Sequence, residues 1–418
     1  MTDFWHSFAD MAAVEESGEL TIERGEGVFV YDDRGRKYLD STASLWYCAI
    51  GHGRGEVADA VERQMRTLET YSTFQDLTSR PTSELAERLA DIAPVRGSKV
   101  FLTSGGSDSI DTAAKLARRY HQLRGDHDRV LFATRDGSYH GMHLGGTSLA
   151  GIEANRAEPA FEVIKAPRDS AEGLASSLDR AGSERVAAFY CEPVIGAGGV
   201  FAAPDGYLTE TRELCRERGI LFIADEVITG FGRCGEWFAS GRWGLEPDLI
   251  TCAKGVTSGY LPLGAVVTAP WVAEPFWSSD AGMWRHGYTY SGHATVAAAA
   301  LANLAIIEEE GLIGAGLDLE VRLDTALSSL SAHPMVSEIR AGTGAMAAVQ
   351  LDPAQIEADP SLPPRAVQAC RQAGIMTRTL ATGAIHVSPP LVINGEELRL
   401  LADGIRYALD RLEEGRAA

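Results

Sequence analysis

Short apolar runs alternate with longer helical patterns through the middle of this chain, and this alternation restricts the fold more than any other feature. Six runs have the length of buried strands: residues 99–103, 129–133, 186–191, 219–224, 248–252 and 264–268. Helical spacing lies between them, as in the apolar positions Ile110, Ala113 and Ala117. We predict an α/β fold with a mostly parallel sheet covered by helices on both faces. Ligands of such sheets bind outside the carboxyl ends of the strands.

The two ends of the chain have a different pattern. Residues 27–40 resemble a hairpin with its turn at residues 33–35, and the chain beyond about residue 310 mixes helices with short strands, including residues 346–351. We therefore predict a smaller α+β domain built from both ends, residues 1–55 and 309–418. Residues 56–308 are predicted to form the large domain.

Composition excludes several classes of function. The chain has 58 acidic and 38 basic residues among 418, a net charge of −20, which disfavours nucleic acid and anionic membrane surfaces as partners. No run of 18 apolar residues and no basic leader followed by an apolar run is present. Six cysteines without a CxxC pair, and no His or Cys cluster with metal spacing, indicate a reduced compartment and no metal site. We expect a cytoplasmic protein.

Two charged residues stand at predicted strand ends. Asp225 follows the apolar run 219–224, and Lys254 comes 29 residues later, after the run 248–252. This spacing is about one strand–helix–strand crossover, so both side chains are expected to face the same edge of the sheet. A lysine between Ala253 and Gly255 is a candidate for Schiff-base chemistry, because desolvation disfavours its ammonium form. The alternative is an ordinary Asp–Lys salt bridge.

A glycine-containing turn connects the first predicted strand to a helix. Residues 103–107, Thr-Ser-Gly-Gly-Ser, place free backbone N–H groups at the start of that helix, where an anion such as a phosphate binds without a lysine cluster. The alternative is a tight turn in which Ser107 caps the helix.

Taken together, these and other motifs resemble the class III pyridoxal-phosphate-dependent aminotransferases of fold type I. The likeness runs from Phe4 to Pro390. The matching segments, in chain order, are Leu45-Trp-Tyr47 with Gly51-His-Gly53, Ser104-Gly-Gly-Ser-Asp108, Ser138-Tyr-His-Gly141, Glu192-Pro193, Ala224-Asp-Glu-Val227 with Gly230-Phe-Gly-Arg233, Ala253-Lys-Gly255, Thr289-Tyr-Ser-Gly-His293 and Ser388-Pro-Pro-Leu391. The order of so many motifs is what makes the resemblance specific.

The resemblance implies a role for each matched residue. Lys254 is expected to bond covalently to the cofactor aldehyde and then to move the proton between substrate and cofactor. Asp225 is expected to keep the pyridine nitrogen protonated, which makes the ring an electron sink. Further cofactor-binding residues implied by the motifs are Gly106 and Ser107 on the phosphate, Val227 and Tyr139 on the two faces of the ring, and His140 beside Tyr139.

Thr289 implies a second chain. In the family, the threonine of this segment reaches the phosphate of the neighbouring subunit, so a homodimer with shared sites is expected, with a tetramer as the larger alternative. The other interpretation is that Thr289 caps a helix of its own chain.

Three further positions concern the substrate. Trp46 resembles the pocket tryptophan of the branch that acts on ω-amino acids and amines with pyruvate. Arg378 stands near the position of the family's carboxylate-binding arginine, and a surface salt bridge is the alternative. Glu192 is expected to line the pocket or to pair with that arginine. The phosphate motif departs from the usual Ser-Gly-Ser-Glu-Ala at Gly105, Asp108 and Ser109, which puts a bond from the longer glutamate in doubt.

The resemblance therefore predicts a transaminase that moves an amino group from an amine or ω-amino acid to pyruvate or a similar keto acid, by a ping-pong reaction through pyridoxamine phosphate. A racemase, aminomutase or decarboxylase on the same fold is an alternative, as is a biosynthetic aminotransferase for a larger ketone or aldehyde. A non-catalytic regulator is disfavoured, because both Lys254 and Asp225 are present.

Overall fold

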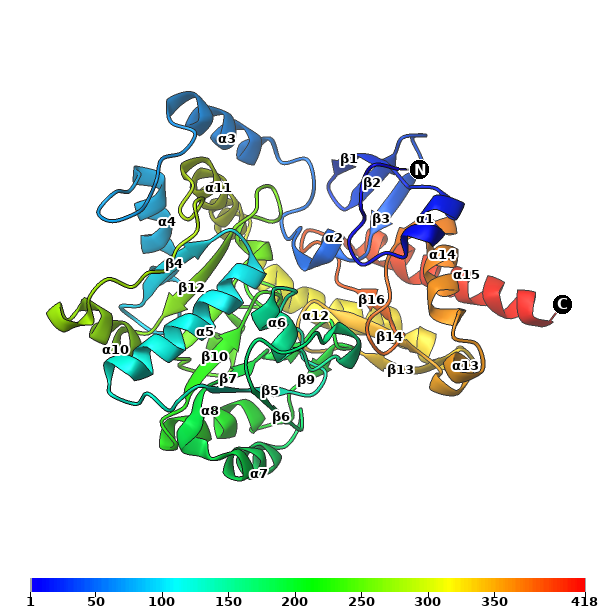
Figure 1. Ribbon diagram of the computed structural model, residues 1–418. Helices are drawn as coiled ribbons and strands as arrows, with labels where there is room; N and C mark the ends of the chain where they lie inside the picture. The colour runs from blue at the N-terminus through cyan, green and yellow to red at the C-terminus, as the bar shows by residue number, and fades with distance from the viewer. Residues whose placement is uncertain (1, 418) are drawn as a thin grey trace.

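A seven-stranded sheet forms the centre of the computed structural model, which describes residues 2–417 (Figure 1). Its strand order is β4-β12-β11-β10-β7-β5-β6, and β12 alone runs antiparallel to its two neighbours. The predicted mostly parallel sheet is thus confirmed. The strands are β4 (Lys99–Thr103), β5 (Leu131–Arg135), β6 (Val163–Ala166), β7 (Val186–Cys191), β10 (Leu221–Asp225), β11 (Leu249–Cys252) and β12 (Gly264–Thr268).

Helices cover this sheet because their apolar faces need burial. α5 (Gly106–Leu123) lies across the front of the sheet in Figure 1 and buries Ile110, Ala113 and Ala117 against it. α11 (Ala294–Glu309) is apolar nearly all round, and it is enclosed by neighbours that include α3 and α4. The other helices of residues 55–273 are α3 (Gly55–Thr67), α4 (Arg80–Asp91), α6 (Leu144–Leu149), α7 (Ala171–Ala181), α8 (Tyr207–Glu217), α9 (Ala239–Arg242) and α10 (Pro270–Ala273).

Strands from the two ends of the chain meet in a second sheet. Its order is β1-β2-β3-β15, and β15 (Ile375–Met376) pairs in parallel with β3 (Lys37–Asp40). Figure 1 shows the first strands of the chain beside its last helices. In the predicted hairpin of β2 (Phe29–Asp32) and β3, the Asp32 carboxylate accepts from the amides of Arg34 and Arg36. The remaining strand of this sheet is β1 (Ile22–Glu26).

The C-terminal third adds a three-stranded sheet and several helices. This sheet has the order β13-β14-β16, with bounds Val336–Arg340, Ala347–Leu351 and Ile385–Val387. The two strands β8 (Val194–Ile195) and β9 (Phe201–Ala202) form a separate pair. The remaining helices are α1 (Met11–Ser17), α2 (Ala43–Trp46), α12 (Leu312–Ser328), α13 (Pro353–Ala358), α14 (Leu362–Gln372) and α15 (Gly395–Ala417). The domain bounds at residues 55 and 308 stay a prediction.

None of the helices that the structure describes has the length and apolar character needed to cross a membrane.

The carboxyl edge of the large sheet brings three strand ends together. β10 ends at Asp225, which lies opposite Thr251 of β11, and β11 is followed directly by Ala253 and Lys254. Because β12 is antiparallel, its first residue Gly264 stands at this same edge, paired with Thr103 at the end of β4. Asp225 and Lys254 therefore lie at the ends of neighbouring strands, at the same edge of the sheet, as their spacing in the sequence predicted.

Gly264 has no space for a side chain, and we predict that Gly264→Ala destabilises the protein. An added Cβ would overlap the carbonyl oxygen of Gly105 and lie 2.5 Å from the hydroxyls of Thr103 and Ser109. Overpacking of this kind costs about 1–3 kcal/mol. Denaturant unfolding measures the loss. Gly314→Ala in exposed helical surroundings, where the Cβ meets nothing within 4 Å, is the control and should be neutral or slightly stabilising. Equal stability of the two variants would contradict this account.

Candidate active site

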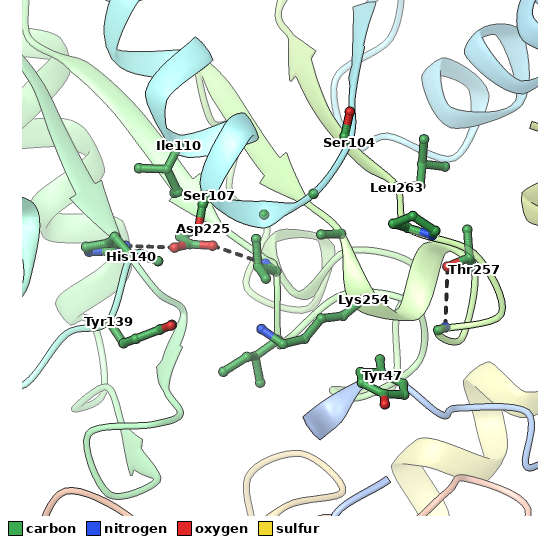
Figure 2. Close-up of a pocket in the computed structure, with 18 of the residues that line it drawn as sticks. Tyr47, Ser104, Ser107, Ile110, Tyr139, His140, Asp225, Lys254, Thr257 and Leu263 are labelled. Carbon is green, nitrogen blue, oxygen red and sulfur yellow. Dashed lines mark hydrogen bonds and ion pairs between the residues drawn. The ribbon is translucent and has the colours of Figure 1, made fainter. Parts of the chain in front are cut away.

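A cavity of about 430 Å³ opens at this edge of the sheet, and Figure 2 shows its lining. Eight of the eleven residues singled out from the sequence line it: Gly106, Ser107, Tyr139, His140, Glu192, Asp225, Val227 and Lys254. They come from the ends of β4, β7, β10 and β11 and from the segment after β5. The fold therefore concentrates one amine, two carboxylates and a helix start in one concave site.

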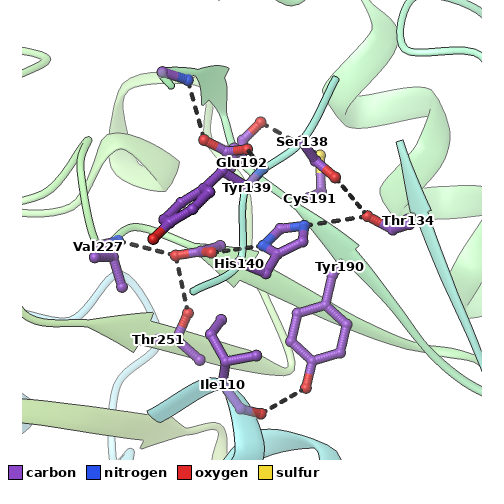
Figure 3. Close-up of polar contacts among 12 residues, drawn as sticks. Ile110, Thr134, Ser138, Tyr139, His140, Tyr190, Cys191, Glu192, Val227 and Thr251 are labelled. Atoms are coloured by element: carbon purple, nitrogen blue, oxygen red, sulfur yellow. Dashed lines mark hydrogen bonds and ion pairs between the residues drawn. The ribbon is translucent and has the colours of Figure 1, made fainter. Parts of the chain in front are cut away.

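Asp225 is buried, and its carboxylate is fixed by three donors (Figure 3). One oxygen accepts from the amide of Val227 at 3.1 Å and from the hydroxyl of Thr251 at 3.2 Å. The other oxygen lies 2.7 Å from Nδ1 of His140. A buried carboxylate is stable only when it is paired in this way. Among the described residues, Asp225 and Lys254 form no ion pair within 4 Å, so the interpretation of these two as a simple salt bridge is wrong.

His140 connects Asp225 to a chain of hydroxyls. Its Nε2 lies 3.1 Å from the hydroxyl of Thr134, which is 2.8 Å from the hydroxyl of Ser138. A carboxylate only accepts hydrogen bonds, so Nδ1 carries a proton, and a neutral ring then accepts from Thr134 at Nε2. The position of Asp225 is thus set by groups on both β5 and β11.

Lys254 extends into the cavity between Asp225 and Tyr47, with its amine directed toward Tyr139 in Figure 2. Burial lowers the pKa of this amine to about 8, while the nearby Asp225 carboxylate opposes the shift. Nζ has no hydrogen-bond partner among the residues that the structure describes. An amine with a depressed pKa and a free approach is suited to covalent attack on a carbonyl carbon.

The start of α5 forms a cradle for an anion. Gly105 is its N-cap residue and provides no side-chain cap, so the first-turn N–H groups stay open. Ser107 does not cap the helix, so the alternative interpretation of this turn is wrong. Its hydroxyl accepts from the amide of Met142 at 3.1 Å instead. Asp108 accepts from the amide of Ser104 at 3.2 Å, which supports the turn despite the shorter side chain at this position.

Close packing keeps this cradle small. A Cβ on Gly106 would lie 3.1 Å from Val227, and a Cβ on Gly141 would overlap the hydroxyl of Ser107. Val227 and Tyr139 both line the cavity that this cradle borders. A flat, phosphorylated ring with an aldehyde fits the donor set: helix amides for the phosphate, Asp225 for a protonated ring nitrogen and Lys254 for the aldehyde.

Glu192 lines the cavity, and its carboxylate binds two backbone amides. Its two carboxylate oxygens accept from the amides of Tyr139 at 2.8 Å and Gly196 at 3.0 Å. Burial raises its pKa, against the effect of these bonds. Within residues 2–417, Glu192 makes no ion pair with Arg378, so that alternative does not hold in this structure.

The other three predicted residues lie outside the cavity lining. Trp46 is 3% exposed and stacks on His386, with ring centroids 3.7 Å apart, instead of facing the cavity. Thr289 is exposed, and it caps no helix, because α11 begins after His293. Arg378 is half-buried, burial lowers its pKa, and its Nε has no hydrogen-bond partner. The surface salt bridge considered for Arg378 is not formed among the described residues.

Three residues of the site were not predicted from the sequence: Thr134, Thr251 and Tyr47. The two threonines stand within strands and carry no motif of their own, and only the strand register shows that they face His140 and Asp225. Tyr47 adjoins the motif residue Trp46, and the backbone conformation of that turn decides which of the two faces the cavity. No group of three or more candidate metal ligands occurs in the part of the chain that the structure describes.

Comparisons with known proteins agree with this geometry. A family model described as class-III aminotransferase matches residues 11–409. Putrescine–pyruvate aminotransferase of Pseudomonas aeruginosa is 37% identical, covering 97% of this chain and 93% of its own length. Omega-amino acid–pyruvate aminotransferase of Pseudomonas putida is 34% identical, with 94% and 92% covered. The crystal structure of an omega transaminase from Pseudomonas jessenii in complex with PMP matches with a TM-score of 0.92 at 34% identity, over 98% of this chain and 96% of that one.

This chain belongs to the class-III aminotransferase family. It is an enzyme of fold type I that depends on pyridoxal phosphate and transfers amino groups.

The lowered pKa of Lys254 gives a prediction for cofactor loading. Only the unprotonated amine attacks the aldehyde, so the rate at which cofactor-free protein binds pyridoxal phosphate should rise with pH and level off above about pH 8. For an ordinary lysine the rise would continue to about pH 10.4. Stopped-flow absorbance measures this rate. Lys254→Ala is the control for reaction at other lysines, and a rate still rising at pH 10 in the wild type would contradict the assignment.

Proposed function

We propose that this enzyme transfers an amino group from a small primary amine or ω-amino acid to pyruvate or a similar keto acid, in a homodimer with shared sites. The observation that carries the proposal is the desolvated amine of Lys254 in one cavity with the fixed carboxylate of Asp225. The relatives that act on putrescine or ω-amino acids with pyruvate support the substrate classes.

Lys254 and Asp225 divide the chemistry. Bound pyridoxal phosphate supplies an aldehyde for the substrate amine and an electron sink for the developing negative charge. Asp225 is oriented by His140, Val227 and Thr251, and its carboxylate would accept a hydrogen bond from the protonated ring nitrogen. This bond would keep the nitrogen protonated, so that the ring can take up the developing negative charge. Lys254 would take the proton from the amine-bearing carbon of the substrate and deliver it to the aldehyde carbon of the cofactor, a role typically worth about 10²–10⁴-fold in rate. Its pKa near 8 suits both directions of transfer.

The other matched residues position the cofactor. The amides at Gly106 and Ser107 hold the phosphate through the positive end of α5. Val227 and Tyr139 bracket the ring, and Glu192 holds the Tyr139 backbone in place through its amide. His140 acts on the ring through Asp225.

Arg378 is the proposed partner of the keto-acid carboxylate. Its guanidinium is half-buried, influences the pKa of both Lys254 and Tyr139, and has an unpartnered Nε. A carboxylate that bonds to it in a bidentate way would satisfy that donor. The side chain stands outside the cavity lining, so it leaves room for an amine without a carboxylate.

The exposed position of Thr289 supports a dimer. Around it, the segment of residues 283–292 presents Met283 and Tyr290, which are 69% and 66% exposed, and Met283 lines a second cavity with Phe74. Large exposed apolar side chains of this kind mark protein interfaces. A second copy would cover them and bring Thr289 to the phosphate of its partner, and a tetramer of two such dimers is compatible with this.

Six buried cysteines without disulfides support a cytoplasmic location.

Removal of the side-chain amine of Lys254 should abolish amino transfer. We predict that Lys254→Ala lowers kcat for amine–pyruvate transfer by at least about 10³-fold while the protein stays folded, because the variant lacks the proton-transfer group. Alanine formation from pyruvate measures turnover, and circular dichroism verifies the fold. Borohydride reduction of the holoenzyme, followed by peptide mass spectrometry, should place a pyridoxyl group on Lys254. Normal turnover in the variant, or no adduct on this lysine, would exclude the proposal.

Hybrid dimers test the shared site. Thr289→Val should weaken cofactor binding by removing a hydrogen bond to a charged group, about 1.5–3 kcal/mol. In a hybrid with one Lys254→Ala chain and one Thr289→Val chain, the intact lysine would receive Thr289 from the other chain. Cofactor affinity at that site should therefore equal the wild-type value. If Thr289 acts within its own chain, the hybrid will bind as weakly as the Thr289→Val homodimer.

A further inference from the structure

Arg378 stands on a short hairpin of residues 377–386. The amide of His386 donates to the carbonyl of Arg378 at 3.0 Å, and the hydroxyl of Thr377 donates to the carbonyl of His386 at 2.7 Å. Burial and, after it, the charge of Arg378 lower the pKa of Lys254, so this guanidinium acts on the catalytic cavity. Its position depends on what fixes the hairpin to the rest of the protein.

A loop of residues 196–200, between β8 and β9, connects the hairpin to the catalytic cavity. At the start of the loop, the amide of Gly196 donates at 3.0 Å to the carboxylate of Glu192, which lines the cavity. The next carbonyl, that of Ala197, accepts from the amide of Ala381 in the hairpin at 3.2 Å. The loop is thus attached to a cavity residue at one point and to the hairpin at the next.

Arg340, at the end of β13, joins the loop to the hairpin through one guanidinium. Its Nε donates to the carbonyl of Gly199 at 2.6 Å. Its Nη2 donates to Oε1 of Gln350 at 2.8 Å and to the hydroxyl of Thr382 at 3.3 Å. Gln350 in turn donates to the carbonyl of Thr382 at 2.9 Å. The planar fork of the guanidinium allows a single side chain to reach both segments.

Close packing surrounds this junction. The Arg340 side chain is 11% exposed, and its guanidinium lies over Phe201, 4.6 Å from the ring centroid. A Cβ on Gly199 would lie 2.6 Å from Cε2 of Phe201 and 3.1 Å from Cγ2 of Thr382. Arg340 also pairs with Glu338, but that carboxylate is exposed, and exposed ion pairs add little stability. The contacts to the loop and the hairpin are therefore the main use of this arginine.

We propose that Arg340 is a positioning residue for the keto-acid acceptor: it holds the hairpin against the loop on Glu192 and so keeps Arg378 where its guanidinium meets the acceptor carboxylate. The proposal rests on the function given above, in which Arg378 binds that carboxylate. An acceptor without a carboxylate makes no use of Arg378, so its reaction does not depend on Arg340. Loss of Arg340 therefore changes which acceptors are used and leaves the chemistry of Lys254 and Asp225 intact.

Exchange of Arg340 tests the proposal in the acceptor half of the reaction alone. Enzyme loaded with pyridoxamine phosphate is mixed with pyruvate or with butanal, and the absorbance of the cofactor gives the limiting rate and the half-saturating concentration. Arg340→Met should raise the half-saturating concentration of pyruvate about tenfold or more, because a displaced guanidinium loses its bidentate contact. The limiting rate and both constants for butanal should stay as in the wild type. An equal loss with both acceptors would show a structural role alone and overturn the proposal.

Neighbours of Arg340 provide matched controls. Arg168 is exposed, and its guanidinium also lies over Phe201, 4.0 Å from the ring centroid. No hydrogen bond joins Arg168 to the hairpin in the part of the chain that the structure describes, so Arg168→Met should leave both acceptors unaffected. Thr382→Val removes the hydroxyl that accepts from Arg340 and should raise the half-saturating concentration of pyruvate. Thr382→Ser keeps a hydroxyl and should match the wild type; a serine variant as impaired as the valine variant would contradict this contact.

Binding without turnover separates this proposal from the proposed function. Propionate has the carboxylate of a keto acid but no ketone that could react. Calorimetry measures its affinity for the enzyme loaded with pyridoxal phosphate, and Arg340→Met and Arg378→Met should each weaken this affinity about tenfold. A wild type that transfers no amino group, together with these losses, would contradict the function and support the role of Arg340. Unchanged propionate affinity in Arg340→Met would overturn the proposal, whether or not Arg378→Met weakens binding.

Discussion

The buried carboxylate of Asp225 is the interaction on which the site depends. A charge at the end of a central strand is costly unless donors surround it. Here the donors come from three places: the next turn at Val227, the neighbouring strand at Thr251, and His140 after β5. The parallel register of β10 with β11 and β7 sets these distances. The orientation of Asp225 therefore depends on the register of β10 with β11 at Thr251 and on the two loops that carry Val227 and His140.

The same sheet edge explains how so acidic a protein holds a phosphate. The net charge is −20, and no lysine or arginine cluster lines the cavity. The cradle uses the open amides at the start of α5, whose partial positive charge comes from the helix itself. Antiparallel β12 brings Gly264 under this turn, where any side chain would collide with Gly105. Helix amides and tight packing, rather than a cluster of charged side chains, thus define the proposed anion site.

Sequence patterns predicted the centre of the molecule well, because strands buried on both faces are read as uninterrupted apolar runs. β4, β7 and β12 have the predicted bounds, and the carboxyl-edge position of Asp225 and Lys254 followed from spacing. β6 was missed since its residues are only half-buried and carry Lys165.

The substrate side of the cavity was less predictable from the sequence than the strands. The exchange of Trp46 for Tyr47 in the cavity depends on three positive φ angles and on Asp40, which no periodicity shows. The role proposed for Thr289 needs a second chain, and only the family resemblance suggested it.

The pairing of β3 with β15 has a consequence for biosynthesis. Leu39 and its partner Ile375 are separated by more than 300 residues, so the ribosome releases the first strand long before the second exists. The turn that presents Tyr47 follows β3 directly, and its sheet is complete only when the last part of the chain has emerged. The phosphate cradle and the lysine-bearing edge, by contrast, are encoded between residues 99 and 268 and can assemble earlier. A nascent chain would thus carry the strands that bear Asp225 and Lys254 before the segment of Trp46 and Tyr47 gains the sheet that supports it.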